Sequence, residues 1–100
     1  MIMTNADVKA CIDYAGGPEY ILGFRFANGY KLAYSPRGEG DTNYRINPNT
    51  DLIEIGGTEY LKFEHHDFNG RPAYSLIPTE CINQVYYMTD VGIRMRDIME

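Results

Sequence analysis

The sequence has no tryptophan, two cysteines and two histidines among its 100 residues. The two histidines, His65 and His66, are too few for a three-histidine zinc site or an H-E-x-x-H motif. No apolar run approaches the roughly 20 residues that a membrane-spanning helix needs. The first five residues lack the basic region and the apolar core of a secretory signal. We therefore expect a cytoplasmic protein that contains no membrane segment.

The two cysteines, Cys11 and Cys81, are far apart and match no metal-ligand spacing. Without an export signal, we expect two reduced, buried thiols, and a disulfide between them is the alternative.

The length and composition predict one domain over residues 1–100. Hydrophobic residues make up 44% of the chain and charged residues 23%, as in ordinary globular proteins. A chain of this length supports one hydrophobic core and little more.

The net charge of −5 is concentrated in the middle of the chain. Residues 39–67 contain seven acids and two bases, which accounts for all of the excess. Phosphate binding needs lysine and arginine, so direct nucleic-acid binding is disfavoured. The same charge attracts a basic protein surface and speeds its capture.

The first element is expected to be a helix. Thr4 and Asp7 have the spacing of a capping box, although Asn5 is an alternative cap. The i, i+3, i+4, i+7 pattern gives one apolar stripe of Val8, Cys11, Ile12 and Ala15. The Gly-Gly-Pro sequence at 16–18 should end the helix.

A hairpin is expected next, with strands at 20–26 and 30–34 around a two-residue turn at Asn28-Gly29. Such a turn pairs Phe24 with Ala33. One face would then carry Leu22, Phe24 and Phe26, and the other Ile21, Leu32 and Tyr34. Both faces would be apolar and would need cover.

Further strands are expected at 44–46, 51–55, 58–67 and 72–77. The turn at Asn69-Gly70 would pair Phe63 with Leu76 and His65 with Tyr74. The core side of the long strand would carry Leu61, Phe63 and His65, and the wetter side Tyr60, Lys62, Glu64 and His66.

The C-terminal region allows two interpretations. We favour a turn or short helix at 78–80, a strand near Ile82–Met88 and a short C-terminal helix; one long helix from Thr79 is the alternative. The fold class is therefore α+β: a bent or barrel-like antiparallel sheet of five to seven strands with an N-terminal helix and a short C-terminal helix.

The one cluster with catalytic potential is Glu64-His65-His66-Asp67. Adjacent residues of a strand face opposite sides, so these four cannot hold one ion unless the strand is broken. Cys81 has no local feature that would lower a thiol pKa. We expect no catalysis, metal or cofactor; a small enzyme or metal-dependent ligand binder using His65 or His66 is an alternative.

The length, the tyrosine-rich hairpins at 20–34 and 64–77 (the second containing FNGRPAYSLIP) and the acidic middle resemble a known type of protein. The chain is similar in general character to small acidic accessory proteins of phages and mobile elements, including anti-CRISPR-type inhibitors. This resemblance implies action in the host cytoplasm on a basic nucleic-acid-binding surface of a defence protein.

The leading functional prediction is a non-catalytic protein-binding module, with inhibition as its expected effect. We expect the acids to form one patch that steers a basic partner, with Tyr60 as an anchor. The predicted partner-binding residues are Asp51, Glu54, Glu59, Tyr60, Glu64 and Asp67. A structural protein that self-associates through the two-sided hairpin is an alternative.

Overall fold

The computed structural model describes residues 2–34, 45–66 and 69–89, with residues 65 and 66 described by their backbone alone. Its elements in chain order are α1 (Asn5–Ala15), η1 (Pro18–Tyr20), β1 (Ile21–Phe26), β2 (Lys31–Ala33), β3 (Leu52–Ile55), β4 (Thr58–His66), β5 (Pro72–Pro78), η2 (Thr79–Cys81) and β6 (Ile82–Tyr87).

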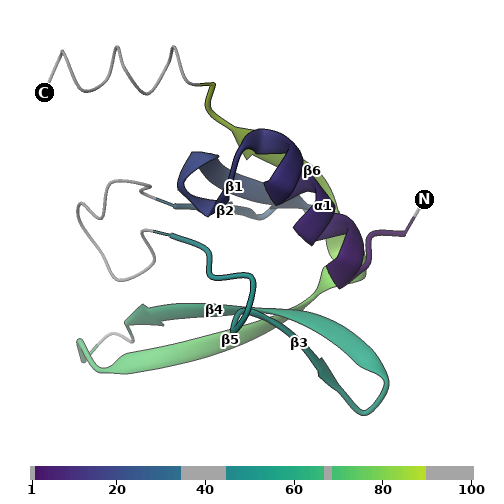
Figure 1. The fold of residues 1–100 in the computed structure, drawn as a ribbon. Coiled ribbons are helices and arrows are strands. Elements are labelled where there is room, and N and C mark those ends of the chain that lie inside the picture. Colours follow the sequence, from purple (N-terminus) through teal and green to yellow (C-terminus); the bar gives the residue numbers. More distant parts are fainter. Residues whose placement is uncertain (1, 35–44, 67–68, 90–100) are drawn as a thin grey trace, which may run out of the picture.

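The fold is α+β, with an N-terminal helix and antiparallel strands, as the sequence predicts. The described strands form two sheets of three, however, and not one sheet of five to seven. Sheet A has the order β2-β1-β6 and sheet B the order β3-β4-β5. The short 3-10 turn η2 carries the chain from sheet B into sheet A (Figure 1).

The C-terminal region follows the favoured interpretation as far as it is described. Residues 79–81 form a turn and a strand begins at Ile82, so the alternative of one long helix from Thr79 is wrong. The expected C-terminal helix falls in residues 90–100, outside the described residues.

Helix α1 begins and ends where the sequence predicts. The Thr4 hydroxyl accepts a hydrogen bond from the Asp7 amide, and the Asp7 carboxylate accepts one from the Thr4 amide, which completes the capping box. Gly16 adopts φ 111° at the C-terminal end, and the Gly17 amide donates to the Ile12 carbonyl. This left-handed C-cap explains the need for glycine there.

The first hairpin has a register that differs by one residue from the expected one. Gly23 pairs with Ala33 and Phe24 with Leu32, because the turn contains three residues, 27–29, and not two. A one-residue shift moves a whole strand to the other face. Leu32 and Tyr34 therefore join Phe24 on the core side, and the expected two-sided apolar hairpin is wrong.

An irregularity in β1 adds one more apolar side chain to the core. The pairing of β1 with β6 shifts between Ile21 and Gly23, which leaves Leu22 as an extra residue on β1. Such a bulge changes the alternation of faces. Ile21 and Phe24, three residues apart, are consequently both fully buried.

The second hairpin also differs from prediction by one residue. Phe63 pairs with Ser75, and His65 with Ala73, in place of the expected Leu76 and Tyr74. The predicted faces of β4 hold where side chains are described. Leu61 is buried and Phe63 packs against the core.

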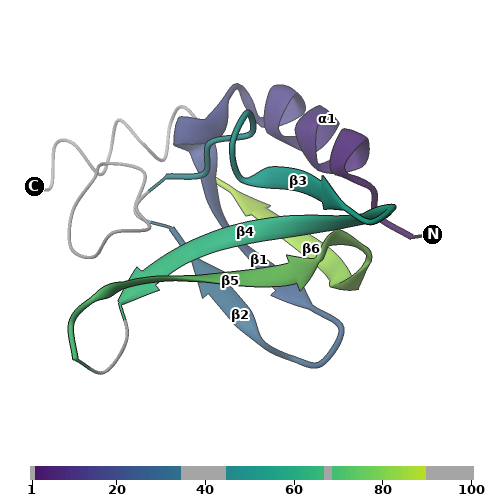
Figure 2. The ribbon, with the colours of Figure 1, turned by 90° about the horizontal axis from the view of Figure 1, so that it is seen from below.

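The core lies between the two sheets and α1. Each sheet has one edge strand near α1 and one far from it (Figure 2). The near edge strands are β6 of sheet A and β3 of sheet B, and the far ones are β2 and β5. Val8 and Ile12 of α1 are fully or almost fully buried against the sheets. Ile46 is also buried, but Arg45 and Ile46 belong to no strand, so the strand expected at 44–46 is wrong for its described residues.

Two remaining expectations concern the cysteines and the membrane. Cys11 and Cys81 are free thiols, as predicted, but each is half-buried and not fully buried as expected. Among the described residues, no helix combines the length and the apolar character required to cross a bilayer.

Candidate functional site

The predicted acidic residues do not all share one face of sheet B. Glu54 and Glu59 lie directly opposite each other in the β3–β4 ladder, on the side that carries the buried Leu61. Tyr60 and Glu64 occupy the other side, because side chains alternate along β4. The described acids therefore do not form the single patch that the sequence suggested, and Asp67 lies outside the described residues.

Glu59 has an intramolecular role. Its Oε1 accepts a hydrogen bond of 2.7 Å from the backbone amide of Asn5, the first residue of α1. A carboxylate at this end of a helix also complements the helix dipole. Glu59 thus helps to attach α1 to sheet B, whereas Glu54 is exposed.

Asp51 is held in the turn that precedes β3. Its Oδ2 accepts a hydrogen bond of 2.8 Å from the Asn47 amide, and the Thr50 hydroxyl lies 3.4 Å from its Oδ1. Burial raises the pKa of Asp51 above its ordinary value, although these hydrogen bonds and nearby Lys62 oppose the shift. Asp51 is therefore partly withdrawn from water.

The side of sheet B that faces away from the core exposes several large apolar side chains. This surface, called the outer face, carries Ile53, Ile55, Tyr60, Lys62, Glu64, Tyr74 and Leu76. The exposed fractions are 58% for Tyr74, 50% for Ile55 and 46% for Leu76. In Figure 1, α1 and sheet A lie on the other side of sheet B, and no described element covers the outer face.

A cation–π contact between Lys62 and Tyr74 lies on the outer face. The Lys62 Nζ lies 4.8 Å from the centroid of the Tyr74 ring. Lys62 and Glu64 alternate with inward-facing residues on β4, and Tyr74 lies opposite Glu64 on β5. The outer face therefore combines exposed apolar groups with one cation and one anion, and its tyrosines are of the residue type enriched in protein interfaces.

The structure does not test the alternative of an enzyme or metal-dependent ligand binder that uses His65 or His66. His65 and His66 end β4, opposite Ala73 and Pro72, and their side chains are outside the description. Among the described residues, no group of three or more His, Cys, Asp or Glu is arranged to hold a metal ion.

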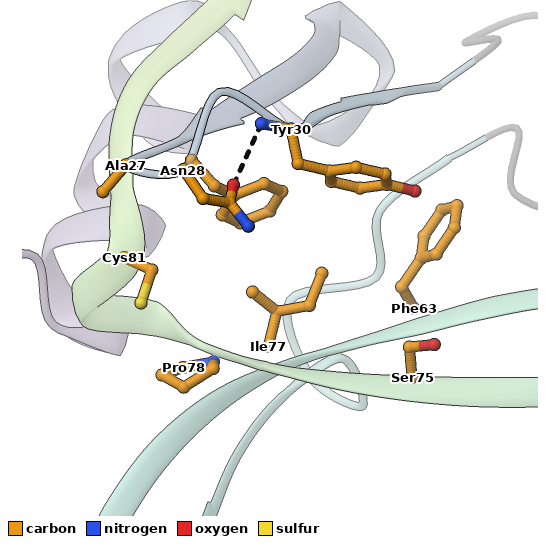
Figure 3. Close-up of a pocket in the computed structure, with 9 residues that line it drawn as sticks. Ala27, Asn28, Tyr30, Phe63, Ser75, Ile77, Pro78 and Cys81 are labelled. Atoms are coloured by element: carbon orange, nitrogen blue, oxygen red, sulfur yellow. Dashed lines mark hydrogen bonds between the residues drawn. The ribbon is translucent and has the colours of Figure 1, made fainter.

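A pocket of about 630 Å³ opens between the β1–β2 turn, the inner side of sheet B and the η2 turn. Figure 3 shows Tyr30 and Phe63 at one end, Ile77 projecting from sheet B, and Pro78 and Cys81 at the other end. The walls are mainly apolar, and no charged side chain of the described residues lines them. The volume is within the range of small-molecule sites.

The pocket and the exposed pair Tyr74 and Leu76 could not be predicted from the sequence. Both depend on hairpin register. The expected pairing placed Leu76 opposite the core residue Phe63, whereas the observed pairing places it opposite Lys62 on the outer face. The register of each hairpin was the missing information.

The chain matches no family model, no curated protein and no solved structure in the three comparisons.

Proposed function

We propose that this protein is a non-catalytic protein-binding module that docks on a basic protein surface through the outer face of sheet B. The observation that supports it is the exposure of Tyr74, Leu76 and Ile55 together on one sheet face that no described element covers. Association would remove these apolar groups from water, and tyrosine is frequent among the residues that dominate binding energy.

The contact between Lys62 and Tyr74 favours an anchoring role for the tyrosine. A ring already held by a cation loses less rotational freedom when it binds. Tyr60, the anchor expected from the sequence, lies half-buried on the same face. The proposed contact therefore keeps Tyr60 and Glu64 and adds Tyr74, Leu76 and Ile55.

The net charge of −5 supports a basic partner. The overall field attracts a basic surface from a distance, whereas the outer face supplies the contact itself. Occupation of a nucleic-acid-binding surface is the form of inhibition that fits this charge, because the same field repels phosphate.

Self-association through the first hairpin is not supported by the register. The large side chains of that hairpin lie mainly on one face, where Phe24, Phe26, Leu32 and Tyr34 are buried in the core. The apolar surface that this hypothesis required is therefore unavailable to a second copy.

The test is affinity capture from a lysate of the natural source with three forms of the protein. The double variant Tyr74→Ser/Leu76→Ser removes the two most prominent groups of the outer face on β5. The matched control, Ile2→Ser/Tyr14→Ser, removes one exposed aliphatic and one exposed aromatic side chain elsewhere. Thermal unfolding followed by circular dichroism checks that all three forms are folded.

We expect the wild type and the control to retain the same basic protein at low salt and the outer-face variant to lose it. The retained protein, once purified, should release a bound oligonucleotide when wild-type protein is added. Equal retention by all three forms contradicts the proposed surface. Retention of nucleic acid after the proteins have been removed contradicts the proposed partner class.

A further inference from the structure

We propose that the pocket between the β1–β2 turn and the inner side of sheet B binds a small uncharged molecule with an aromatic body and one hydrogen-bond acceptor. This inference goes beyond the proposed function, because the pocket lies on the opposite side of sheet B from the outer face. Its lining comes from β1, the β1–β2 turn, β4, β5 and the η2 turn.

The walls favour a flat apolar body. The Phe26 and Tyr30 rings stack with centroids 5.9 Å apart and an interplanar angle of 29°, which gives one side of the pocket an aromatic surface. Ile77 and Phe63 project toward it from sheet B (Figure 3). A planar ring inserted between these walls would bury apolar area, removing both of its faces from water.

The absence of charge in the lining selects against ions. No lysine, arginine, aspartate or glutamate lines the pocket among the described residues, so an ionic ligand would lose hydration without gaining a partner. The net charge of −5 further disfavours an anion. The ligand class is therefore uncharged.

Asn28 indicates the polar end of the ligand. Its Oδ1 accepts a hydrogen bond of 2.9 Å from the Tyr30 amide, which fixes the orientation of the carboxamide. The group that remains for a ligand is the Nδ2 amide, a donor. In Figure 3 this nitrogen points toward the pocket, so a ligand carbonyl would be its matched acceptor.

The two cysteines provide a reporter and an internal control. Cys81 lines the pocket, whereas Cys11 lies on α1 beside Tyr14 and Val85, in a separate hollow. Both are free and half-buried. Occupation of the pocket should shield Cys81 from a thiol reagent and leave Cys11 unaffected.

The probe is 6-propionyl-2-dimethylaminonaphthalene, an uncharged naphthalene ketone whose emission shifts to the blue in apolar sites. We expect one saturable site per chain. With free probe at ten times its Kd, alkylation of Cys81 by N-ethylmaleimide should slow about tenfold. Alkylation of Cys11, followed in the same sample by peptide mass spectrometry, should be unchanged.

The specificity control is 8-anilinonaphthalene-1-sulfonate, which has a similar ring system and carries a negative charge. We expect it to bind at least about tenfold more weakly, a difference of about 1.4 kcal/mol. Equal binding of the two probes would contradict an uncharged-ligand site.

Two substitutions locate the probe. Ala27→Phe fills the pocket from an exposed turn position and keeps the backbone hydrogen bond from residue 27 to the Cys81 carbonyl. We expect it to abolish the shift in emission. Asn28→Ala removes the proposed donor and should weaken binding while leaving the apolar walls intact, so it provides a second test.

The outer-face variant Tyr74→Ser/Leu76→Ser separates this inference from the proposed function. It should retain the probe and lose the protein partner, whereas Ala27→Phe should lose the probe and retain the partner. The inference is overturned by the absence of saturable binding, by probe binding that Ala27→Phe leaves unchanged, or by a bound probe that fails to shield Cys81. The last result would indicate a site elsewhere.

Discussion

The Oδ1 of Asn5 lies 2.5 Å from the hydroxyl of Thr79, which donates a hydrogen bond to it across 74 residues of sequence. Thr79 is completely buried in η2, where the chain passes from sheet B to sheet A. The Asn5 Nδ2 donates to the Ile53 carbonyl at 3.0 Å. One side chain at the start of α1 therefore joins the helix to sheet B and to the junction between the sheets.

Thr79→Val should destabilise the protein, because it replaces the buried hydroxyl by a methyl group and leaves the Asn5 oxygen without this donor. We expect a loss of about 1–3 kcal/mol in the free energy of unfolding, measured by urea denaturation. Asn83→Ala, at an exposed position of β6, is the control and should change stability by no more than about 0.5 kcal/mol. Equal values for the two variants would contradict the structural role of this hydrogen bond.

Gly23→Ala should also be destabilising. A Cβ atom at Gly23 would collide with the backbone carbonyl oxygen of Leu32 on the neighbouring strand, and backbone cannot move aside as a flexible side chain can. We expect a cost of about 1–3 kcal/mol or more, by the same measurement. Arg25→Ala, at an exposed position of the same strand, is the control. A Gly23→Ala protein as stable as the control would show that the strands are further apart than described.

Tyr34→Phe should leave the stability unchanged near neutral pH or increase it by up to about 1 kcal/mol. The Tyr34 hydroxyl is buried and has no hydrogen-bond partner among the described residues. Burial, with a smaller contribution from Asp51, raises the pKa of Tyr34 well above its ordinary value of 10.0.

The raised pKa of Tyr34 also predicts an alkaline effect. Above a pH of about 10 the unfolded chain releases this proton before the folded chain does, so the wild type should lose about 1.4 kcal/mol per pH unit relative to Tyr34→Phe. Urea denaturation at a series of pH values measures the difference. Tyr14→Phe, on an exposed ring, is the control, and parallel curves for wild type and Tyr34→Phe would contradict the burial of an un-ionised phenol.

The free energy of unfolding of Asp51→Asn should increase relative to that of the wild type as the pH rises from acid to neutral. Burial raises the pKa of Asp51 above 3.8, so the folded state favours the protonated form. The stability that this preference contributes is present below the unfolded pKa and is lost as the pH rises through the folded one. Asparagine keeps an oxygen to accept from the Asn47 amide. A pH trend of the opposite sign, measured by urea denaturation, would contradict this prediction.

Binding of the captured partner should depend on salt through its association rate. The Debye length falls from about 10 Å at 0.1 M to about 3 Å at 1 M, which screens the attraction before contact. Glu54→Lys/Glu64→Lys should slow association by about tenfold or more while changing dissociation less. Glu59 is left intact because it holds the start of α1. Association rates that are equal at both salt concentrations, measured by surface plasmon resonance, would remove the electrostatic part of the proposal.

Local signals in the sequence were sufficient to predict most of the elements. Thr4, Asp7 and Gly16 define the limits of α1 through hydrogen bonds within a few residues. The turn at 79–81 and the strand that begins at Ile82 also agree with the prediction. The site was predicted less well: Tyr60 and Glu64 lie on the outer face, whereas Glu54 and Glu59 do not.

The sequence by itself determined where the helix and most strands begin and end, because caps, apolar periodicity and turn residues act over short distances. Tertiary structure alone decided which faces meet. A register that differs by one residue in each hairpin moved Leu32 and Tyr34 into the core and placed Leu76 on the outer face. The registers of the two hairpins could not be inferred from the Asn-Gly pairs, because side-chain packing between the sheets acts on the register as well as the turn residues do.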